Sequence, residues 1–376
     1  MSHTPHHESP HIHVVHLIKG LGPGGAERLI VNQLETADRG VESTVLRLIK
    51  SKSHLVGDVE RTGATTLLIG GGRFWPLALS KRIGNLSPDV IHAHSPILAS
   101  AARVIVAARR LNIPVITTEH NRWPRHHWLT RTLNRITAPL DTRRIAVSHD
   151  VKESMSARLH KSTVVLDHGV PVDQLLALRE KRPELRARLL GDAAEHTVVI
   201  GIVANFRPEK AYDVFFAAAA RAVTERDNVH FFVIGQGPGE DAFRQQVAHA
   251  GLASQIEVLG YREDATEAMT AFDIFTLSSR HEGKPVSLME AFALGIPVVA
   301  TRAGGIPEAV THEHDGLLVD VDDSNALCDS WLRLVDDAEL RARFAQAALR
   351  SSAGFDASVS TRSIESMYKD VSSGTG

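Results

Sequence analysis

Short apolar runs alternate with longer segments whose apolar residues recur at helical spacing along most of the chain. The runs of the first half that predict strands are Ile12–Ile18, Val45–Leu48, Thr65–Leu68, Val90–His94, Val115–Thr118 and Arg144–Val147. A second series consists of Thr197–Ala204, His230–Ile234, Ile256–Leu259, Ile274–Leu277 and Val298–Ala300. A loop and a helical pattern follow nearly every run, which is typical of βαβ units with parallel sheets.

Two series of strands predict two domains, because 376 residues exceed what one ordinary core holds. The polar stretch Gln174–Glu195 separates them and places the boundary near residue 180. The fold class is α/β, with two doubly wound Rossmann-like domains. We expect a flexible His-rich tail over 1–11, an N-terminal domain over 12–180, a C-terminal domain over 181–355, and a helix over 356–376 that returns to the N-terminal domain. Ligands of such sheets bind beyond the carboxyl ends of the strands, so functional residues should follow strands.

Composition narrows the class of protein. The formal net charge is −2, and hydrophobic and charged residues make up 43% and 23% of the chain, which indicates a globular protein without a field that attracts nucleic acid. The single cysteine, Cys328, excludes an internal disulfide and is expected to be a buried thiol. Because the chain shows neither a secretory pattern nor a run of about 18 apolar residues, we expect a cytoplasmic location.

One segment of the second domain carries the pattern of an anion site. Residues 278–291 follow a predicted strand and open a helix, with Pro285 in its first turn. The amides of Val286, Ser287 and the next residue are then donors without intrahelical partners at the positive end of the helix dipole. Such amides favour a diphosphate.

Charged side chains flank this helix start. Glu282 and Glu290 could bind hydroxyl groups on either side of a diphosphate, although an ordinary surface helix with incidental glutamates explains the pair equally well. Arg207 and Lys210 follow the first strand of the second domain, where cations can meet phosphate oxygens. Their place at a strand exit favours phosphate contact over a solvated pair of surface charges.

These segments together resemble the second domain of the retaining GT-B glycosyltransferases of family 4. That family carries a Glu-x7-Glu motif, matched by Glu282 and Glu290, and an Arg…Lys pair, matched by Arg207 and Lys210. The loop 259–262 is similar to its nucleobase pocket wall. The resemblance runs from about residue 14 to 370 and implies two domains that face each other across a cleft.

The resemblance extends to the first domain. Gly24 and Gly25 lie in a stretch similar to the family's Gly-Gly-Ala-Glu-Arg, which borders the donor diphosphate and the acceptor. It implies that His120, at a strand end, contacts the transferred sugar, and His94 could line the acceptor side or be structural. The chain departs from the family's Pro-Asn-Gly before the second domain, where His168 is expected to be structural.

Arginines and tryptophans are concentrated between Arg122 and Arg144. Apolar residues recur there at helical spacing, namely Leu129, Leu133, Ile136 and Leu140. An amphipathic helix of this composition could lie on an anionic membrane surface, which would suit a lipid-linked acceptor and a peripheral position at the inner membrane face. The interpretation that we favour is a helix packed on its own domain, with its arginines in solvent or holding an anionic acceptor.

The function expected from the resemblance is retaining transfer of a hexose-type sugar from a nucleotide-diphosphate sugar, with UDP-sugars favoured, to a saccharide or lipid-linked acceptor in cell-surface polysaccharide or glycolipid synthesis. Arg207, Lys210, Glu282 and His120 are the candidate catalytic residues. The candidate substrate-binding residues are Glu290, Val286, Ser287, Tyr261, Arg262, Gly24, Gly25 and His94. We predict no metal or other cofactor, because cations and helix amides already offset the diphosphate charge, and no nucleic-acid partner. A nucleotide-sugar 2-epimerase and a catalytically silent scaffold stay open as alternatives.

Overall fold

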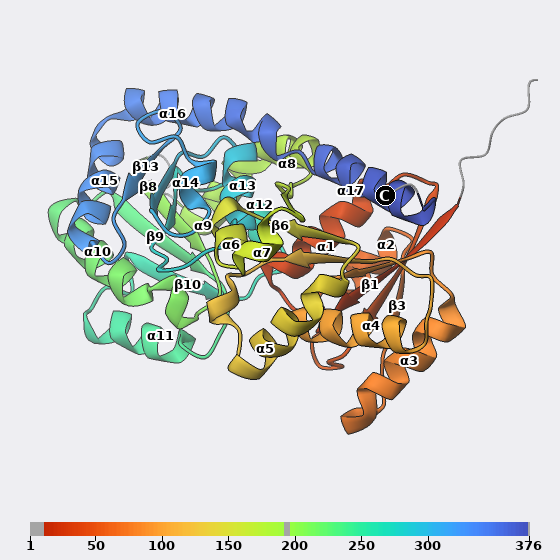
Figure 1. The fold of residues 1–376 in the computed structure, drawn as a ribbon. Coiled ribbons are helices and arrows are strands. Elements are labelled where there is room, and N and C mark those ends of the chain that lie inside the picture. The colour runs from red at the N-terminus through yellow and green to blue at the C-terminus, as the bar shows by residue number, and fades with distance from the viewer. Residues whose placement is uncertain (1–10, 192–195, 375–376) are drawn as a thin grey trace, which may run out of the picture. The chain divides into compact units, whose positions relative to one another are not determined.

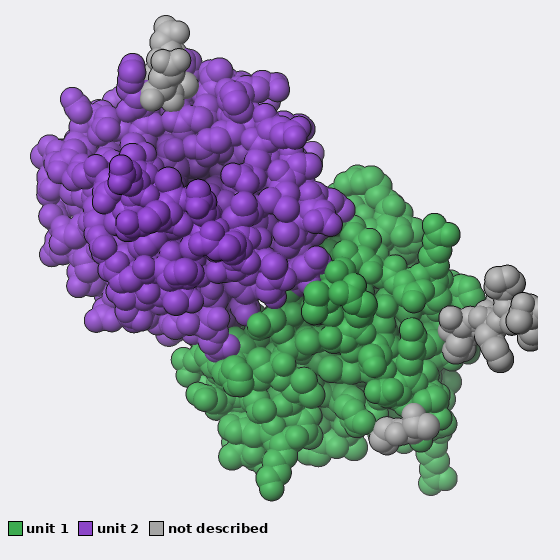
Figure 2. Space-filling model, turned by 90° about the horizontal axis from the view of Figure 1, so that it is seen from above, with its two compact units in different colours: residues 1–168, 357–376 green, residues 169–356 purple. Residues whose placement is uncertain are grey.

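The computed structural model describes residues 11–191 and 196–374 (Figure 1). The predicted His-rich tail lies outside these residues, apart from residue 11. The chain divides into two compact units, coloured separately in Figure 2. The first takes the chain up to His168 together with the segment from Ala357 onward, and the second takes Gly169 to Asp356.

The first unit is built on one sheet of parallel strands in the order β3-β2-β1-β4-β5-β6-β7. Its strands are β1 Ile12–Ile18, β2 Val41–Arg47, β3 Thr65–Leu68, β4 Val90–Ala93, β5 Val115–Glu119, β6 Arg143–Ala146 and β7 Thr163–Val165. Its helices are α1 Gly25–Glu35, α2 Val56–Arg61, α3 Trp75–Leu86, α4 Pro96–Ala108, α5 Trp128–Thr137, α6 His149–Glu153, α7 Ala157–His160 and α17 Ala357–Ser372, with short 3₁₀ turns η2 Trp123–Arg125 and η3 Ala138–Leu140.

The core of the first unit forms because apolar strand residues are buried on both faces of a parallel sheet. On one face Val15 and Leu17 pack against α3 and α4 residues such as Leu79 and Leu98. The final helix α17 lies against α1, β1 and β4 and contributes Tyr368 to another core cluster. The last segment of the chain thus belongs to the first unit.

The second unit holds a second parallel sheet in the order β10-β9-β8-β11-β12-β13. Its strands are β8 Val198–Val203, β9 Val229–Ile234, β10 Ile256–Gly260, β11 Ile274–Leu277, β12 Val298–Thr301 and β13 Gly316–Val319. Its helices are α8 Val172–Leu178, α9 Arg182–Leu190, α10 Tyr212–Glu225, α11 Glu240–His249, α12 Ala265–Met269, α13 Val286–Ala293, α14 Ile306–Ala309, α15 Ser324–Asp336 and α16 Ala338–Ser351.

Every predicted strand is present, and the two that the sequence did not predict, β7 and β13, lie at sheet edges. The boundary falls after His168 rather than near residue 180, because α8 packs on α13 of the second unit. In each sheet the strand order reverses once, between β1 and β4 and between β8 and β11. The carboxyl ends of these strand pairs are where such folds bind ligands.

Candidate functional site

Lys210 and Glu282 meet at the carboxyl ends of β8 and β11. Lys210 Nζ donates to Glu282 Oε1 at 2.6 Å and to Oε2 at 2.8 Å, and Ser279 Oγ donates to the same Oε1 at 2.6 Å. The two charged side chains are 19% and 8% exposed, so this pair is only partly in contact with water. The sequence placed both residues in one site, and the structure joins them directly.

Neighbouring loops hold the segment 278–284 in place. Ser278 Oγ donates to the carbonyl of Lys210 at 2.8 Å, and the Arg280 amide donates to the Glu209 carbonyl at 2.8 Å. On the other side, Gly304 has φ of +54°, and a Cβ there would lie 1.9 Å from the carbonyl oxygen of Glu282. Glycine is therefore required at 304 both for its backbone angle and for the close approach.

The helix that opens this site is α13, which begins at Val286. Pro285 is the residue before its first turn, with extended φ and ψ of −67° and 125°, rather than a residue inside the turn. The amides of Val286 and Ser287 belong to the first turn, where no intrahelical acceptor exists. Both residues follow Glu282 in the connection from β11 to α13.

The predicted nucleoside-binding residues lie on adjacent elements. Thr266 Oγ1, from α12, donates to Glu290 Oε1 at 3.2 Å, which brings α13 next to the loop that precedes α12. That loop contains Tyr261, which is 36% exposed, and Arg262, whose guanidinium donates to both Asp264 oxygens at 2.8 and 2.6 Å. The Arg262 charge is thus already balanced by a neighbour.

Arg207 differs from Lys210 in its surroundings. It is exposed at the start of the 3₁₀ turn Pro208–Lys210, and its guanidinium has no hydrogen-bond or ion-pair partner within residues 11–191 and 196–374. The structure therefore brings Lys210 to Glu282 but does not bring Arg207 to either glutamate.

In the first unit, Gly24 and Gly25 mark the beginning of α1, directly after the loop that leaves β1. Gly24 is in the extended region, and a Cβ at this position would meet the Glu27 carboxylate at 2.4 Å. Close packing against a carboxylate accounts for glycine here, and Gly25 is exposed at the helix start.

Histidines lie close together at the carboxyl ends of β1 and β4, where the strand order of the first sheet reverses. The predicted residues His94 and His120 are joined by a hydrogen bond of 3.3 Å between Nδ1 and Nε2. Two further histidines that sequence reasoning did not select, His16 on β1 and His92 on β4, are fully buried beside them. Their signal was the polar residue inside each apolar run, on neighbouring strands of the expected sheet.

These histidines are neutral at physiological pH. Burial lowers the pKa of His16 to about 4, with a smaller effect from His13, and lowers the pKa of His120 to about 3, with a smaller effect from His168. Burial and the neighbouring imidazoles also hold the pKa of His92 and His94 well below its usual value. His16, His92 and His94 each offer one ring nitrogen within 4.8 Å of the others.

His168 lies at the end of the first unit, where the family-like pattern is broken. Its ring centroid is 5.7 Å from that of His120, and its Nδ1 is 3.2 Å from the Leu166 carbonyl oxygen. His168 thus lies beside the histidine group, although the sequence suggested only a structural role.

The segment between Arg122 and Arg144 forms α5 with η2 and η3 on either side. Three of its large apolar residues face outward, since Trp128 is 64% exposed, Ile136 is 67% exposed and Leu140 is 51% exposed, whereas Trp123 and Ala138 are buried. The buried face is polar, because Asn134 and Thr137 accept hydrogen bonds from Arg103 on α4 at 2.6 and 3.1 Å. α5 thus packs on α4 through polar residues, which reverses the apolar inner face usual for a surface helix.

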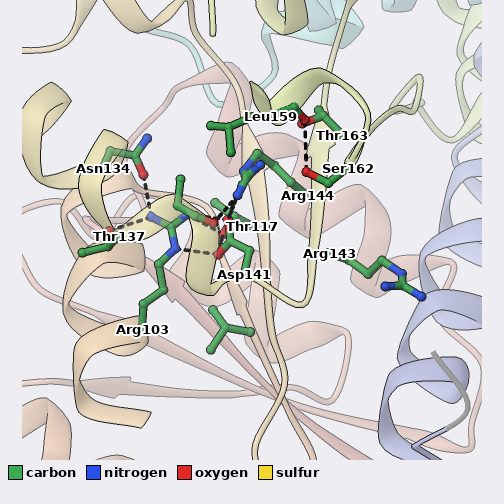
Figure 3. A network of polar contacts seen from close by, with 12 residues as sticks. Arg103, Thr117, Asn134, Thr137, Asp141, Arg143, Arg144, Leu159, Ser162 and Thr163 are labelled. Carbon is green, nitrogen blue, oxygen red and sulfur yellow. Dashed lines mark hydrogen bonds and ion pairs between the residues drawn. The ribbon is translucent and has the colours of Figure 1, made fainter. Parts of the chain in front are cut away.

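A buried ion network fixes this reversed helix (Figure 3). Asp141 accepts from Arg103 Nε at 2.5 Å and from Arg144 Nη2 at 2.7 Å, and all three side chains are at most 2% exposed. Arg103 also donates to Thr117 on β5 at 2.9 Å. Arg144 is therefore an internal residue and not part of the arginine surface that the sequence suggested.

Some further observations concern residues away from these groups. The Asp320-Val321-Asp322 triplet forms a turn after β13, and Asp322 pairs with Arg280 at 2.6 Å. Cys328 is buried as predicted, and burial raises the pKa of its thiol to about 11. Within the part of the chain that the structure describes, no helix is long and apolar enough to cross a membrane.

Comparison with known families assigns both units. Residues 23–174 match the family described as Glycosyltransferase Family 4, and residues 197–337 match the family described as Glycosyl transferases group 1. The first match lies mainly in the first unit and ends just inside the second, the other match lies in the second unit, and together they span most of the chain.

Curated relatives are similar over different lengths. A lipopolysaccharide core biosynthesis mannosyltransferase of Rhizobium meliloti, LpsB, is 27% identical over 350 residues, which cover 88% of this chain and 94% of that protein. The Escherichia coli UDP-Gal:alpha-D-GlcNAc-diphosphoundecaprenol alpha-1,3-galactosyltransferase is 24% identical over 78% of this chain and 79% of that protein. The N-acetyl-alpha-D-glucosaminyl L-malate synthase of Bacillus anthracis is 32% identical, but over only 40% of this chain and 39% of that protein.

Solved structures show the same fold. The structure of Anabaena HepE in complex with UDP and glucose has a TM-score of 0.82 and 20% sequence identity, covering 96% of this chain and 100% of that one. At this identity the likeness establishes the fold, two Rossmann-like domains with parallel sheets.

Proposed function

This chain belongs to the GT-B glycosyltransferases, and we propose that it is a retaining enzyme that takes a hexose-type sugar from a nucleotide-diphosphate sugar. The acceptor is a saccharide or a lipid-linked saccharide, in cell-surface polysaccharide or glycolipid synthesis. Uridine diphosphate is the favoured carrier, since the named E. coli relative uses a UDP-sugar and HepE was solved with UDP.

The observation that carries this proposal is the Lys210–Glu282 pair beside the first turn of α13. An ammonium group has three donors, and Glu282 takes two of them, so a third can bind a phosphate oxygen without breaking the pair. The α13 amides add dipole and hydrogen bonds to the same anion. Arg207, exposed on the adjacent loop, supplies a second cation when the diphosphate is present.

The proposed reaction places its charges accordingly. As the bond from sugar to diphosphate breaks, negative charge develops on the diphosphate, and Lys210, Arg207 and the helix amides stabilise it. Glu282 holds hydroxyls of the sugar ring and Glu290 holds the ribose, with Tyr261 and Arg262 beside the base. The departing phosphate takes the proton of the acceptor hydroxyl, which attacks from the same face and so retains configuration.

A transfer assay with matched lysine variants tests this. Lys210→Ala should lower turnover by roughly a hundredfold or more, on the scale of lost oxyanion-type stabilisation. Lys181→Ala is the control, because Lys181 is half exposed and pairs with Glu267 at 3.4 Å in the same unit. Equal turnover in both variants would end the proposed mechanism.

Product analysis distinguishes a glycosyltransferase from an epimerase and from a catalytically silent scaffold. UDP-glucose and other UDP-hexoses are incubated with and without a diphospholipid-linked saccharide acceptor, and the products are followed by NMR. Transfer with a retained anomeric configuration supports the proposal. Conversion to an epimer without acceptor indicates a 2-epimerase, and UDP binding without any turnover indicates a scaffold.

The outward apolar face of α5 supports an anionic membrane surface as the place where a lipid-linked acceptor is met. A hollow of about 480 Å³ adjoins α5 and is lined by Trp123, Arg131, Arg135, Ile136 and Met155 among others. Arginines beside exposed aromatic and aliphatic groups match a layer of lipid phosphates above acyl chains.

Vesicle binding tests this second part. The double variant Arg131→Glu/Arg135→Glu should lose binding to phosphatidylglycerol vesicles, whereas Arg39→Glu, also an exposed arginine on the first unit, should retain most of it. Trp128→Ser should weaken binding more than Val359→Ser, which changes another exposed apolar residue of the first unit. If the members of each pair bind equally, or if phosphatidylcholine vesicles bind as well, α5 is not the docking face.

A further inference from the structure

Three histidines of the first unit form a continuous line of hydrogen bonds. Ser43 Oγ lies 3.5 Å from His16 Nε2, His16 Nδ1 lies 3.2 Å from His94 Nε2, and His94 Nδ1 lies 3.3 Å from His120 Nε2. The line runs from the buried Ser43 on β2, through β1 and the end of β4, to the half-buried His120 at the end of β5.

The two links between imidazoles have the same geometry. The Nδ1 atom of one imidazole faces the Nε2 atom of the next, from His16 to His94 and from His94 to His120. A neutral imidazole carries one N–H donor and one lone-pair acceptor. Each link needs one N–H donor and one acceptor nitrogen. If Nδ1 of one ring carries the proton, Nε2 of the next ring must accept, so the proton of that next ring is also on Nδ1.

We propose that His16 and His94 are positioning residues that fix His120 in a single neutral tautomer, and thereby decide whether His120 Nδ1 donates or accepts a hydrogen bond at the sugar site. All three imidazoles then share one tautomer, either Nδ1–H throughout or Nε2–H throughout. A mixed line would leave two N–H groups or two lone pairs facing each other in the interior. Each such mismatch would leave two buried polar groups without a hydrogen-bond partner, which is unfavourable.

The surroundings exclude a charged line. No carboxylate contacts these nitrogens among the described residues, and burial together with neighbouring imidazoles disfavours a second proton on any ring. The line therefore cannot act as a store for the proton of the acceptor. Its effect is orientation of a neutral group, and His120 Nδ1, which has no hydrogen-bond partner among the described residues, is the end that a ligand can reach.

His92 belongs to the same cluster but not to the line. Its Nδ1 is 2.5 Å from the Tyr368 hydroxyl and its Nε2 is 2.8 Å from Thr118 Oγ1, so hydrogen bonds to neutral partners engage both nitrogens. Its ring centroid lies 4.1 Å from that of His94, and both residues are buried. A substitution at His92 can therefore serve as the control for a substitution at His94. It disturbs the same buried cluster without breaking the hydrogen-bonded line.

The inference rests on the proposed function for the role of His120, but the line itself can be observed without any activity. In ¹⁵N-histidine NMR spectra of the whole chain near pH 7, His16, His94 and His120 should all show the same neutral tautomer. His94→Gln should convert His120 to a mixture of tautomers, and His92→Gln should leave the tautomer of His120 unchanged.

Kinetics give the second readout. His94→Gln should lower kcat about tenfold, the equivalent of one misplaced hydrogen bond, with a smaller change in the KM for the donor. Mixed or charged imidazoles in the unaltered protein, or equal effects of His94→Gln and His92→Gln on the His120 signals, would overturn the inference. A uniform line in a protein whose Lys210→Ala variant keeps full turnover would instead refute the proposed function and leave the line intact.

Discussion

Removing the central charge of the Arg103–Asp141–Arg144 network should be severely destabilising. Asp141→Asn keeps the volume and one acceptor oxygen, so packing is retained while the negative charge is lost. Asp141 accepts hydrogen bonds from Arg103, Arg144 and Thr117 at 2.5–3.0 Å (Figure 3). The variant would leave two guanidinium groups, 0% and 2% exposed, facing each other without an anion.

The magnitude follows from the burial. Breaking a buried ion pair by removing one partner costs about 3–5 kcal/mol, and here one carboxylate serves two cations. A domain is stabilised by about 5–15 kcal/mol in total, so the loss takes a third or more of a typical value. The exposed pair of Arg226 with Asp336, 39% and 47% exposed, should contribute far less to stability, because water screens both charges.

Urea denaturation and hydrogen exchange of the purified protein distinguish the two substitutions. Because a chain with two compact units need not unfold in one step, exchange is followed in peptides from β5, β6 and α5 of the first unit. Asp141→Asn should speed exchange there by a hundredfold or more, whereas Asp336→Asn should leave it within a few fold. Similar exchange in both variants would show that the buried network does not hold α5 and that the energetic argument is wrong.

Two further predictions use the histidine line and the loop after β12. Because the pKa values of His16 and His120 lie near 4 and 3, below the usual 6.5, the unfolded chain binds protons first as the pH falls. Unfolding free energy should therefore drop from pH 6.5 downward, by about 3 kcal/mol by pH 4 for His16 alone, and His16→Gln should flatten this part of the curve. Gly304→Ala should sharply reduce the rise in melting temperature that UDP produces, because its Cβ would meet the Glu282 carbonyl. Gly63→Ala is the control, since Gly63 also has a positive φ but has open space around it, and this variant should keep the rise. Equal rises in both variants would contradict the prediction.

Much of the second-unit site could be predicted from the sequence, because its residues lie close to one another in two short segments. Lys210 follows one buried strand and Glu282 follows another, and parallel strands bring their carboxyl ends to one sheet edge. What the sequence did not reveal is that the two side chains bind each other. Side-chain pairing depends on rotamers and on the loop after β12, which the strand pattern does not specify.

The first-unit histidines show the opposite case. His16 and His92 each interrupt an apolar run, but a histidine in one run does not by itself indicate a site. Their importance depends on which strands are neighbours, since β1 and β4 are adjacent in space but separated by two strands in sequence. The polar inner face of α5 could not be predicted from its own sequence either. Its buried polar residues are hydrogen-bonded to Arg103, which lies on another helix.

The residues at the carboxyl ends of the two sheets, where the strand order reverses, are charged in the second unit and neutral in the first. The proposed reaction requires this difference. In the proposed reaction, Lys210 and the α13 amides of the second unit bind an anion whose negative charge grows as the sugar leaves. The sugar itself becomes positively charged in the transition state of glycosyl transfer. A cation beside it would raise the barrier, so a histidine at that position must be neutral. Burial of His16, His94 and His120 achieves this within the pH range of a cell, because their pKa values are held well below 6.5. Replacing His120 with Arg should therefore lower the rate of transfer further than replacing it with Ala. An arginine variant as active as the alanine variant would show that this residue does not face the sugar.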